Sequence, residues 1–187
     1  TMKNILVTGA NGLLGTNTIH ELLNKGYQVK GFVRNKRSYL GHKHKNFKLI
    51  EGDFNSLSNL MKVTKNVDCI IHCAAQTNQA LLRYEQYRTV NVIAVRNLLS
   101  AAIKNSVSRF VFVSTANVFG YGDSKNLGHE NSKIRYPYNN SFYAKSKLEA
   151  SEFLEKKRTE IEIVTVNPTF MIGAFDSKPS SGKIVQI

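Results

Sequence analysis

The sequence predicts an α/β fold in which a doubly wound parallel sheet is flanked by helices. Short apolar runs alternate with segments of helical hydrophobic spacing along the 187 residues, which is the pattern of repeated strand–helix–strand units. The first unit also places three glycines, Gly9, Gly12 and Gly15, between its strand and its helix. The length of the chain suits one well-packed domain.

The first three elements form one strand–helix–strand unit. Ile5–Val7 is a short apolar strand, and Thr16–Lys25 has apolar residues at helical spacing before a glycine. Val29–Val33 is the next apolar run and the second strand. The unit has the βαβ order that a dinucleotide-binding motif requires.

The same alternation continues to the end of the chain. Further strands are predicted at Phe47–Ile50, Val67–His72, Phe110–Val113 and Ile161–Val166, and helices at Ser56–Thr64, Tyr84–Asn105 and Ser141–Lys157. Asn117–Asn140 is a long irregular stretch rich in polar residues. A loop of that length in a compact domain is usually functional. Ligands of such sheets bind outside the carboxyl ends of the strands.

The glycine turn predicts a pyrophosphate site. Gly9 can adopt the positive φ of a tight turn, Gly12 lets backbone approach the phosphates, and Gly15 lets the helix pack tightly on the strand. Backbone N–H groups and the positive helix end point at an anion there. Scattered loop glycines are the alternative interpretation, which the βαβ context disfavours. The expected cofactor contacts are Gly9, Asn11, Gly12, Leu13, Leu14 and Gly15.

The end of the second strand indicates which nicotinamide cofactor is bound. NAD-selective sites place an acidic residue here to bind the adenosine ribose, but Val33 is followed by Arg34, with Lys36 and Arg37 close behind. A guanidinium suits the 2′-phosphate of NADP. We therefore predict NADP, with NAD as the alternative. A loop that is basic for solubility alone is the other interpretation of these residues.

Composition excludes several classes of protein. The net charge is +13, but the cations are spread along the chain without an aromatic ladder or a nucleic-acid module, so no nucleic-acid partner is expected. Without a spanning apolar run or signal peptide we expect a cytoplasmic protein with no membrane association. Cys69 and Cys73 read as small buried hydrophobes, and the histidines show no metal-ligand spacing, so no metal is expected. Thr1 before Met2 is expected to be a remnant of an expression tag.

A tyrosine and a lysine on one predicted helix form a candidate catalytic pair. Tyr143 and Lys147 lie four residues apart and share a helix face. A nearby ammonium lowers the pKa of a phenol towards the range where it can exchange a proton. The spacing is common on ordinary helices. The pair gains weight from Ser114 and Thr115, which close the fifth strand at the edge where ligands bind.

Six motifs in order resemble the extended short-chain dehydrogenase/reductase superfamily. They are TGANGLLG from Thr8, GDF from Gly52, HCAA from His72, NVxAxxNLL from Asn91, VSTANVFG ending at Gly120 and YAKSK from Tyr143. Val166–Gly173 and Lys178–Gly182 are similar to its dihydroflavonol-4-reductase-like or NAD-dependent epimerase/dehydratase branch. The resemblance implies a Rossmann-type dinucleotide-binding domain over residues 1–170. Residues 171–187 would then begin a substrate domain that is truncated or disordered.

The resemblance also implies roles for single residues. Tyr143 is the expected general acid and base, and Lys147 is expected to lower its pKa and to bind the nicotinamide ribose. Thr115 is expected to hold the substrate carbonyl oxygen, with Ser114 as the weaker candidate. Asn91 is expected either near the active site or in helix packing. The remaining expected cofactor contacts are Asp53, Phe54, Ala74, Ala75 and Asn167.

The first expectation for function is an NADP-dependent oxidoreductase that transfers hydride between nicotinamide and a carbonyl or secondary alcohol. A nucleotide-sugar epimerase with tightly bound NAD and a non-catalytic NADP-sensing protein are the alternatives. Ala116 and Asn117 stand where family sugar 4,6-dehydratases carry an Asp-Glu pair, which argues against that reaction. The expected partners are a small-molecule carbonyl or sugar-nucleotide substrate, and a homodimer is the assembly considered.

Overall fold

The computed structural model describes residues 2–78 and 80–176. In this part of the chain six parallel strands form one sheet in the order β3-β2-β1-β4-β5-β6. The strands are β1 (Asn4–Thr8), β2 (Gln28–Val33), β3 (Phe47–Glu51), β4 (Cys69–His72), β5 (Arg109–Val113) and β6 (Glu162–Val166). The strand order reverses between β1 and β4, which is where doubly wound sheets bind their ligands. The predicted fold class is confirmed.

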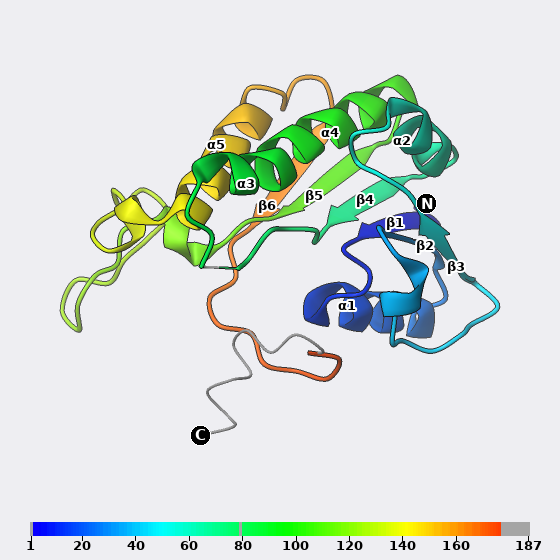
Figure 1. Ribbon diagram of the computed structural model, residues 1–187, viewed down its shortest axis with the longest axis horizontal. Coiled ribbons are helices and arrows are strands. Elements are labelled where there is room, and N and C mark those ends of the chain that lie inside the picture. The colour runs from blue at the N-terminus through cyan, green and yellow to red at the C-terminus, as the bar shows by residue number, and fades with distance from the viewer. Residues whose placement is uncertain (1, 79, 177–187) are drawn as a thin grey trace.

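Helices cover both faces of this sheet (Figure 1). α1 (Leu13–Asn24) lies on one face, and α2 (Leu57–Thr64), α3 (Tyr84–Arg88), α4 (Ala94–Lys104) and α5 (Phe142–Glu155) lie on the other. No helix in the described ranges is long and apolar enough to cross a bilayer. Lys178–Gly182 and most of the predicted segment 171–187 lie outside the described residues.

Each face of the sheet has its own hydrophobic core. The larger core lies between the sheet and helices α2, α4 and α5, and it includes the fully buried Leu6, Leu98 and Phe110. The smaller core lies against α1 and includes Val7 and Ile19. Successive strand residues point to opposite faces, so Leu6 and Val7 enter different cores. Strands covered on both faces need such continuous apolar runs.

Two predicted helices differ from the observed ones. α1 begins at Leu13 rather than Thr16, because Gly12 already serves as its N-cap. The predicted helix Tyr84–Asn105 is divided by a π-helical turn over Thr89–Ile93, between α3 and α4. A π turn inserts one residue into the helical ladder and rotates the residues that precede it. Apolar spacing alone does not reveal such an insertion.

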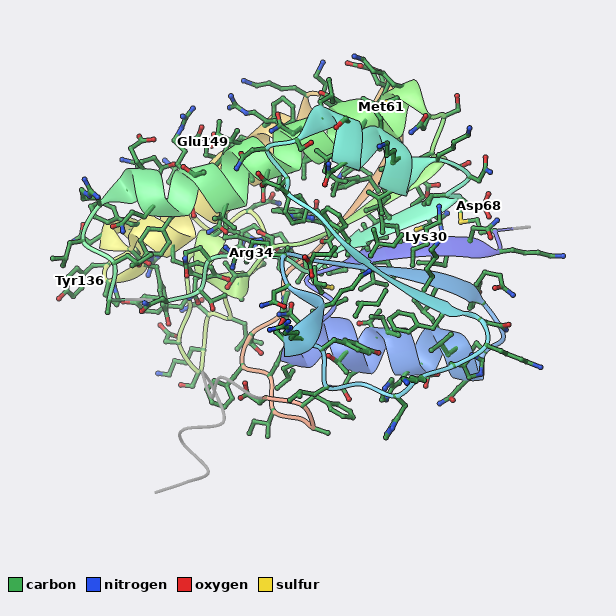
Figure 2. The ribbon with its side chains drawn as sticks, turned by 45° about the vertical axis from the view of Figure 1, so that its right-hand side comes forward. Lys30, Arg34, Met61, Asp68, Tyr136 and Glu149 are labelled. Carbon is green, nitrogen blue, oxygen red and sulfur yellow. The ribbon has the colours of Figure 1, made fainter. Side chains whose placement is uncertain are left out.

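An aspartate ties the strands together at their amino ends. The Asp68 carboxylate accepts hydrogen bonds from the backbone N–H groups of Lys3 and Asn4, both at 2.8 Å. These two bonds hold the pKa of Asp68 below its usual value. Figure 2 shows Asp68 at the other end of the strands from Arg34, which follows β2. The hydrogen bonds of Asp68 are thus made at the amino ends of the strands, away from the carboxyl ends where a ligand site is expected.

Candidate active site

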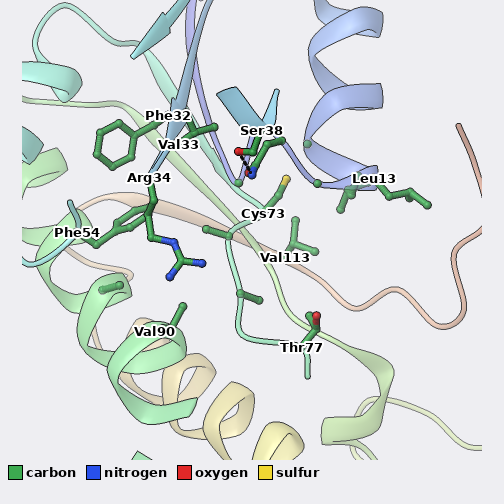
Figure 3. Close-up of a pocket in the computed structure, with 18 of the residues that line it drawn as sticks. Leu13, Phe32, Val33, Arg34, Ser38, Phe54, Cys73, Thr77, Val90 and Val113 are labelled. Carbon is green, nitrogen blue, oxygen red and sulfur yellow. Dashed lines mark hydrogen bonds between the residues drawn. The ribbon is translucent and has the colours of Figure 1, made fainter. Parts of the chain in front are cut away.

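A cavity of about 510 Å³ opens at the carboxyl ends of the central strands (Figure 3). It has the size of a small-molecule or cofactor site. The predicted site residues that line it are Gly9, Asn11, Gly12, Leu13, Leu14, Gly15, Arg34, Asp53, Phe54, Ala74, Ala75, Tyr143 and Lys147. Among the described residues, the predicted Thr115 and Asn167 lie outside this lining. The strand order thus brings the glycine turn and the Tyr-Lys pair to the same cavity.

The glycine turn is shaped by close contacts between backbone segments. Gly9 has φ +64°, and a Cβ there would lie 2.7 Å from the backbone nitrogen of Ala74, which follows β4. A Cβ on Gly15 would overlap the carbonyl oxygen of Gly9. The prediction that Gly15 packs on the strand is therefore corrected: Gly15 packs on the turn itself. A Cβ on Gly12 would lie 3.4 Å from the Gly9 carbonyl oxygen, an ordinary van der Waals contact. Packing within the protein therefore does not require a glycine at position 12.

The helix end beside this turn has no side-chain cap. Gly12 is the N-cap of α1 and makes no side-chain cap hydrogen bond, and the first turn holds no acidic residue. Its first N–H groups therefore keep their capacity to bind an acceptor. Gly12 and Leu13 both line the cavity. The backbone donors and the positive helix end suit an anionic group at this position.

Arg34 reaches into the cavity from the end of β2. Its side chain extends towards the side of the cavity formed by Val90, as Figure 3 shows. Ser38 lies nearby in the lining, and its hydroxyl accepts a 2.7 Å hydrogen bond from the Asn11 side-chain amide. Lys36 lies outside the lining in the described chain, and its backbone N–H donates to the Glu51 carboxylate at 2.8 Å. Arg34 is therefore the cation of this loop that faces the cavity.

Lys147 is buried beside the carboxyl end of β5, and strands β1 and β4 lie between β5 and β2. Its ammonium donates to the Val113 carbonyl at 2.6 Å and lies 4.1 Å from the centre of the Phe112 ring. Only 1% of the residue is exposed. Burial disfavours the charged form and lowers the pKa of Lys147 to about 7, while the nearby Cys73 thiol acts weakly in the opposite direction. Lys147 can therefore gain or lose a proton near neutral pH.

Tyr143 does not have the lowered pKa that the resemblance implied. Burial raises the pKa of its phenol, and a hydrogen bond with the Thr115 hydroxyl acts in the opposite direction. Lys147 does not lower the pKa of Tyr143. The reason is that the Lys147 ammonium is directed at the Val113 carbonyl and is itself partly neutral near pH 7. The phenol of Tyr143 is thus protonated at neutral pH.

The two hydroxyls at the end of β5 have different surroundings. Thr115 contacts Tyr143 through its hydroxyl, which also accepts a 3.3 Å bond from the backbone of Asn117. Ser114 lines the cavity, and its hydroxyl lies 3.2 Å from that of Ser151. Thr115 therefore reaches the site through Tyr143, whereas Ser114 faces the cavity directly.

Several cavity residues were not among the predicted site residues. They are Phe32, Val33, Ser38, Asn55, Cys73, Thr77, Thr89, Val90, Ala94, Val113, Met171 and Asp176, whereas Ser114, which also lines the cavity, was the weaker candidate beside Thr115. Thr89 and Val90 belong to the π turn, which has no sequence signal. Of the two cysteines predicted as small buried hydrophobes, Cys69 is buried, whereas Cys73 is partly buried and lines the cavity. Burial raises the pKa of the Cys73 thiol to about 12.

Asn91 serves in packing rather than in the cavity lining. It is fully buried, and its side chain accepts a 2.7 Å bond from the backbone of Gln76 and donates at 2.9 Å to the Ser146 hydroxyl. These bonds join the segment after β4 to α5. Of the two expected roles, the structure places Asn91 in helix packing.

The chain matches one family model and is similar in sequence to several enzymes. A model of the "NAD dependent epimerase/dehydratase family" matches residues 5–187. The chain is 30% identical over 176 residues to UDP-glucose 4-epimerase of Vibrio cholerae, covering 91% of this chain and 52% of the relative. It is also 30% identical over 165 residues to human dTDP-D-glucose 4,6-dehydratase, covering 82% of this chain and 46% of that protein. It spans about half the length of these curated relatives.

Solved structures agree with the fold. MoeE5, solved in complex with UDP-glucose and NAD, superposes with a TM-score of 0.71 and 29% identity, covering 87% of this chain and 52% of that one. The crystal structure of gox2253 has a TM-score of 0.84 over 98% of this chain and 56% of its own, at 23% identity. The second likeness supports the fold alone.

The close contact at Gly9 predicts a larger loss of stability than backbone strain alone. Gly26 also has positive φ, at +84°, but a Cβ there would meet nothing within 4 Å. Gly26→Ala should therefore lower the free energy of unfolding by about 1–2 kcal/mol, the cost of a left-handed residue. Gly9→Ala should lower it by more, because the new Cβ also collides with Ala74. Equilibrium urea unfolding measures both; equal losses would contradict the contact.

The lowered pKa of Lys147 predicts a pH-dependent contribution to stability. Between about pH 7 and its unfolded value near 10.4 the unfolded chain binds this proton and the folded chain does not, so stability rises with pH. Replacing Lys147 by Met removes the titration. The wild-type free energy of unfolding, measured relative to Lys147→Met in urea, should increase from about pH 7 to about pH 9.5. A difference that stays constant with pH would contradict the buried ammonium.

Proposed function

The chain belongs to the NAD-dependent epimerase/dehydratase family, and on that premise we propose that it binds NADP and transfers hydride between nicotinamide and a carbonyl or secondary alcohol. The observation that carries this proposal is a single cavity with the glycine turn and Arg34 in one part of its lining and Tyr143 and Lys147 in another. A dinucleotide has its phosphates and its reactive ring at separate places. The glycine turn suits the phosphates, and Tyr143 and Lys147 suit the neighbourhood of the reactive ring.

The residues of the glycine turn fit the pyrophosphate of such a cofactor. The uncapped N-terminus of α1 supplies backbone donors, and Gly12 leaves a surface without a Cβ beside them. Asp53 and Ala75 line the same cavity. Asp53 is proposed to contact the adenine amino group, and Ala75 to contact the pyrophosphate and ribose through its backbone. The likeness to MoeE5, solved with NAD, supports a nicotinamide dinucleotide as the ligand.

The preference for NADP is proposed from the end of β2. Arg34 follows β2 directly and lines the cavity, so its guanidinium can make charge-assisted bonds to a 2′-phosphate. The Ser38 hydroxyl, held by Asn11, is a second polar group on this side. NAD is the alternative cofactor, and the neighbour solved with NAD favours it.

Tyr143 is proposed as the general acid in the reducing direction. When bound, nicotinamide supplies hydride at its C4 atom. As the carbonyl carbon of the substrate gains hydride, the Tyr143 phenol donates its proton to the carbonyl oxygen, so an alcohol and a phenolate result. The raised pKa of Tyr143 keeps the phenol protonated beforehand. Lys147, with its pKa near 7, can return a proton to the phenolate.

A nucleotide-sugar epimerase with retained NAD is the second candidate. The relation to UDP-glucose 4-epimerase and to MoeE5, solved with UDP-glucose, favours it. Such an enzyme uses the same groups for a transient oxidation and shows no net consumption of cofactor. Purification followed by cofactor extraction separates the candidates: retained NAD together with interconversion of a sugar nucleotide would contradict the reductase. A non-catalytic NADP sensor would bind NADPH without turning over any substrate.

Removing the Tyr143 hydroxyl should abolish most of the reductase activity. With a panel of aldehydes and ketones, Tyr143→Phe should slow NADPH oxidation about 10²–10⁴-fold, the usual contribution of a positioned general acid. Cofactor affinity should change little. Tyr136→Phe is the matched control, because Tyr136 is 70% exposed and lies outside the cavity lining. Full turnover in Tyr143→Phe would exclude the proposed role.

Reversing the charge of Arg34 should reverse the cofactor preference. Arg34→Asp should weaken NADPH binding about tenfold or more, because a charged hydrogen bond is lost and a like charge is added. NADH binding should be unaffected or stronger. Arg37→Asp outside the lining is the control. The NADP assignment fails if the wild-type protein binds NADH as tightly as NADPH, or if Arg34→Asp leaves their ratio unchanged in fluorescence titrations.

A further inference from the structure

A buried histidine joins two strands directly beneath the glycine turn. His72 is the last residue of β4, and it pairs in register with Thr8, the last residue of β1. The His72 Nδ1 atom lies 2.8 Å from the Thr8 hydroxyl oxygen, and both residues are fully buried. This bond is therefore shielded from water at the point where the two strands reach the cavity.

Packing alone does not explain a histidine at this position. The ring of His72 stacks on Phe110 and Phe112 with centroids 6.1 Å apart in each case, and Phe54 meets it edge-on at 5.8 Å. Burial, with a smaller effect of the Lys147 charge, lowers the pKa of His72 to about 3, so the ring is neutral. Its Nε2 atom is buried without a hydrogen-bond partner in the described chain. Such an atom costs free energy that a phenyl ring would avoid.

The Thr8 hydroxyl contacts both His72 and the backbone beside the glycine turn. Its oxygen also accepts a hydrogen bond from the backbone N–H of Ala74 at 3.4 Å. Ala74 is the residue whose backbone lies against Gly9, close enough that a Cβ on Gly9 would collide with it. Gly9 follows Thr8 in the chain, and both Gly9 and Ala74 line the cavity. The hydroxyl of Thr8 therefore adds a link between two parts of the lining, beside the backbone bond from the Cys73 N–H to the Thr8 carbonyl at 3.3 Å.

We propose that His72 is a positioning residue for cofactor binding: through its Nδ1 atom it fixes the Thr8 hydroxyl, and thereby holds Ala74 against Gly9 in one dinucleotide-binding surface. This inference rests on the proposed function, because the surface is the one assigned to the cofactor. His72 does not reach the ligand in this arrangement. It acts on affinity rather than on the hydride or proton transfer.

Two substitutions separate the hydrogen bond from the packing of the ring. His72→Phe keeps an aromatic ring among Phe54, Phe110 and Phe112 but removes Nδ1. His72→Asn keeps a polar atom near the place of Nδ1 but removes the ring. We expect His72→Phe to raise the Kd and KM for NADPH about tenfold, the effect of one buried hydrogen bond, with kcat nearly unchanged. His72→Asn should lower the melting temperature yet retain most of the affinity.

Thr8 provides an independent test of the same bond. Thr8→Val removes the hydroxyl at nearly constant shape and should weaken NADPH binding as His72→Phe does. The double variant should bind no more weakly than either single variant, because both remove one interaction. If His72→Phe does not fold, Thr8→Val against Thr8→Ser, which keeps the hydroxyl, gives the same comparison.

The results distinguish a failure of this inference from a failure of the proposed function. The inference is overturned, and the proposed function stands, if wild type binds NADPH and His72→Phe and Thr8→Val bind it equally well. It is also overturned if His72→Asn loses affinity while His72→Phe keeps it, since the ring would then be what matters. A wild-type protein that binds neither NADPH nor NADH overturns the proposed function, and the inference falls with it.

Discussion

The site depends on the close approach of three backbone segments at one glycine. Gly9 lies against Ala74 after β4 and against Gly15 in the first turn of α1. None of these contacts leaves room for a side chain, so the turn, the neighbouring strand end and the helix fix one another's positions. The helix end is thereby directed into the cavity that all three segments line. A flexible contact could not hold backbone donors in place for an anion.

A second constraint is the burial of two titratable side chains, Lys147 and His72, beside Phe112. The ring of Phe112 has Lys147 over it and stacks on His72. Burial is the main reason that each of the two titratable groups is more easily neutral than in water, and the charge of Lys147 adds to the effect on His72. Lys147 keeps access to a proton near neutral pH, while His72 stays neutral. The Phe112 ring thus contacts both a side chain whose pKa is near neutral and one that stays neutral at that pH.

The sequence could predict the features that depend on local order. The glycines, the strand–helix alternation and the four-residue spacing of Tyr143 and Lys147 are local patterns, and the structure contains them. The pKa of Tyr143 could not be predicted in this way, because its direction depends on burial and on where the Lys147 ammonium points. The π turn that contains Thr89, a residue of the cavity lining, leaves no signal in the periodic spacing of apolar residues.

The strand order explains why residues so distant in sequence share one cavity. β1 and β4 are neighbours although β2 and β3 come between them in the chain, so the glycine turn after Thr8 lies beside the segment after His72. β5 is next to β4 and carries Val113, whose carbonyl holds the Lys147 ammonium. Each site motif therefore follows or faces the carboxyl end of a central strand. The Thr8–His72 hydrogen bond joins the ends of β1 and β4 where both side chains are fully buried, so it lies between the hydrophobic core and the residues that line the cavity.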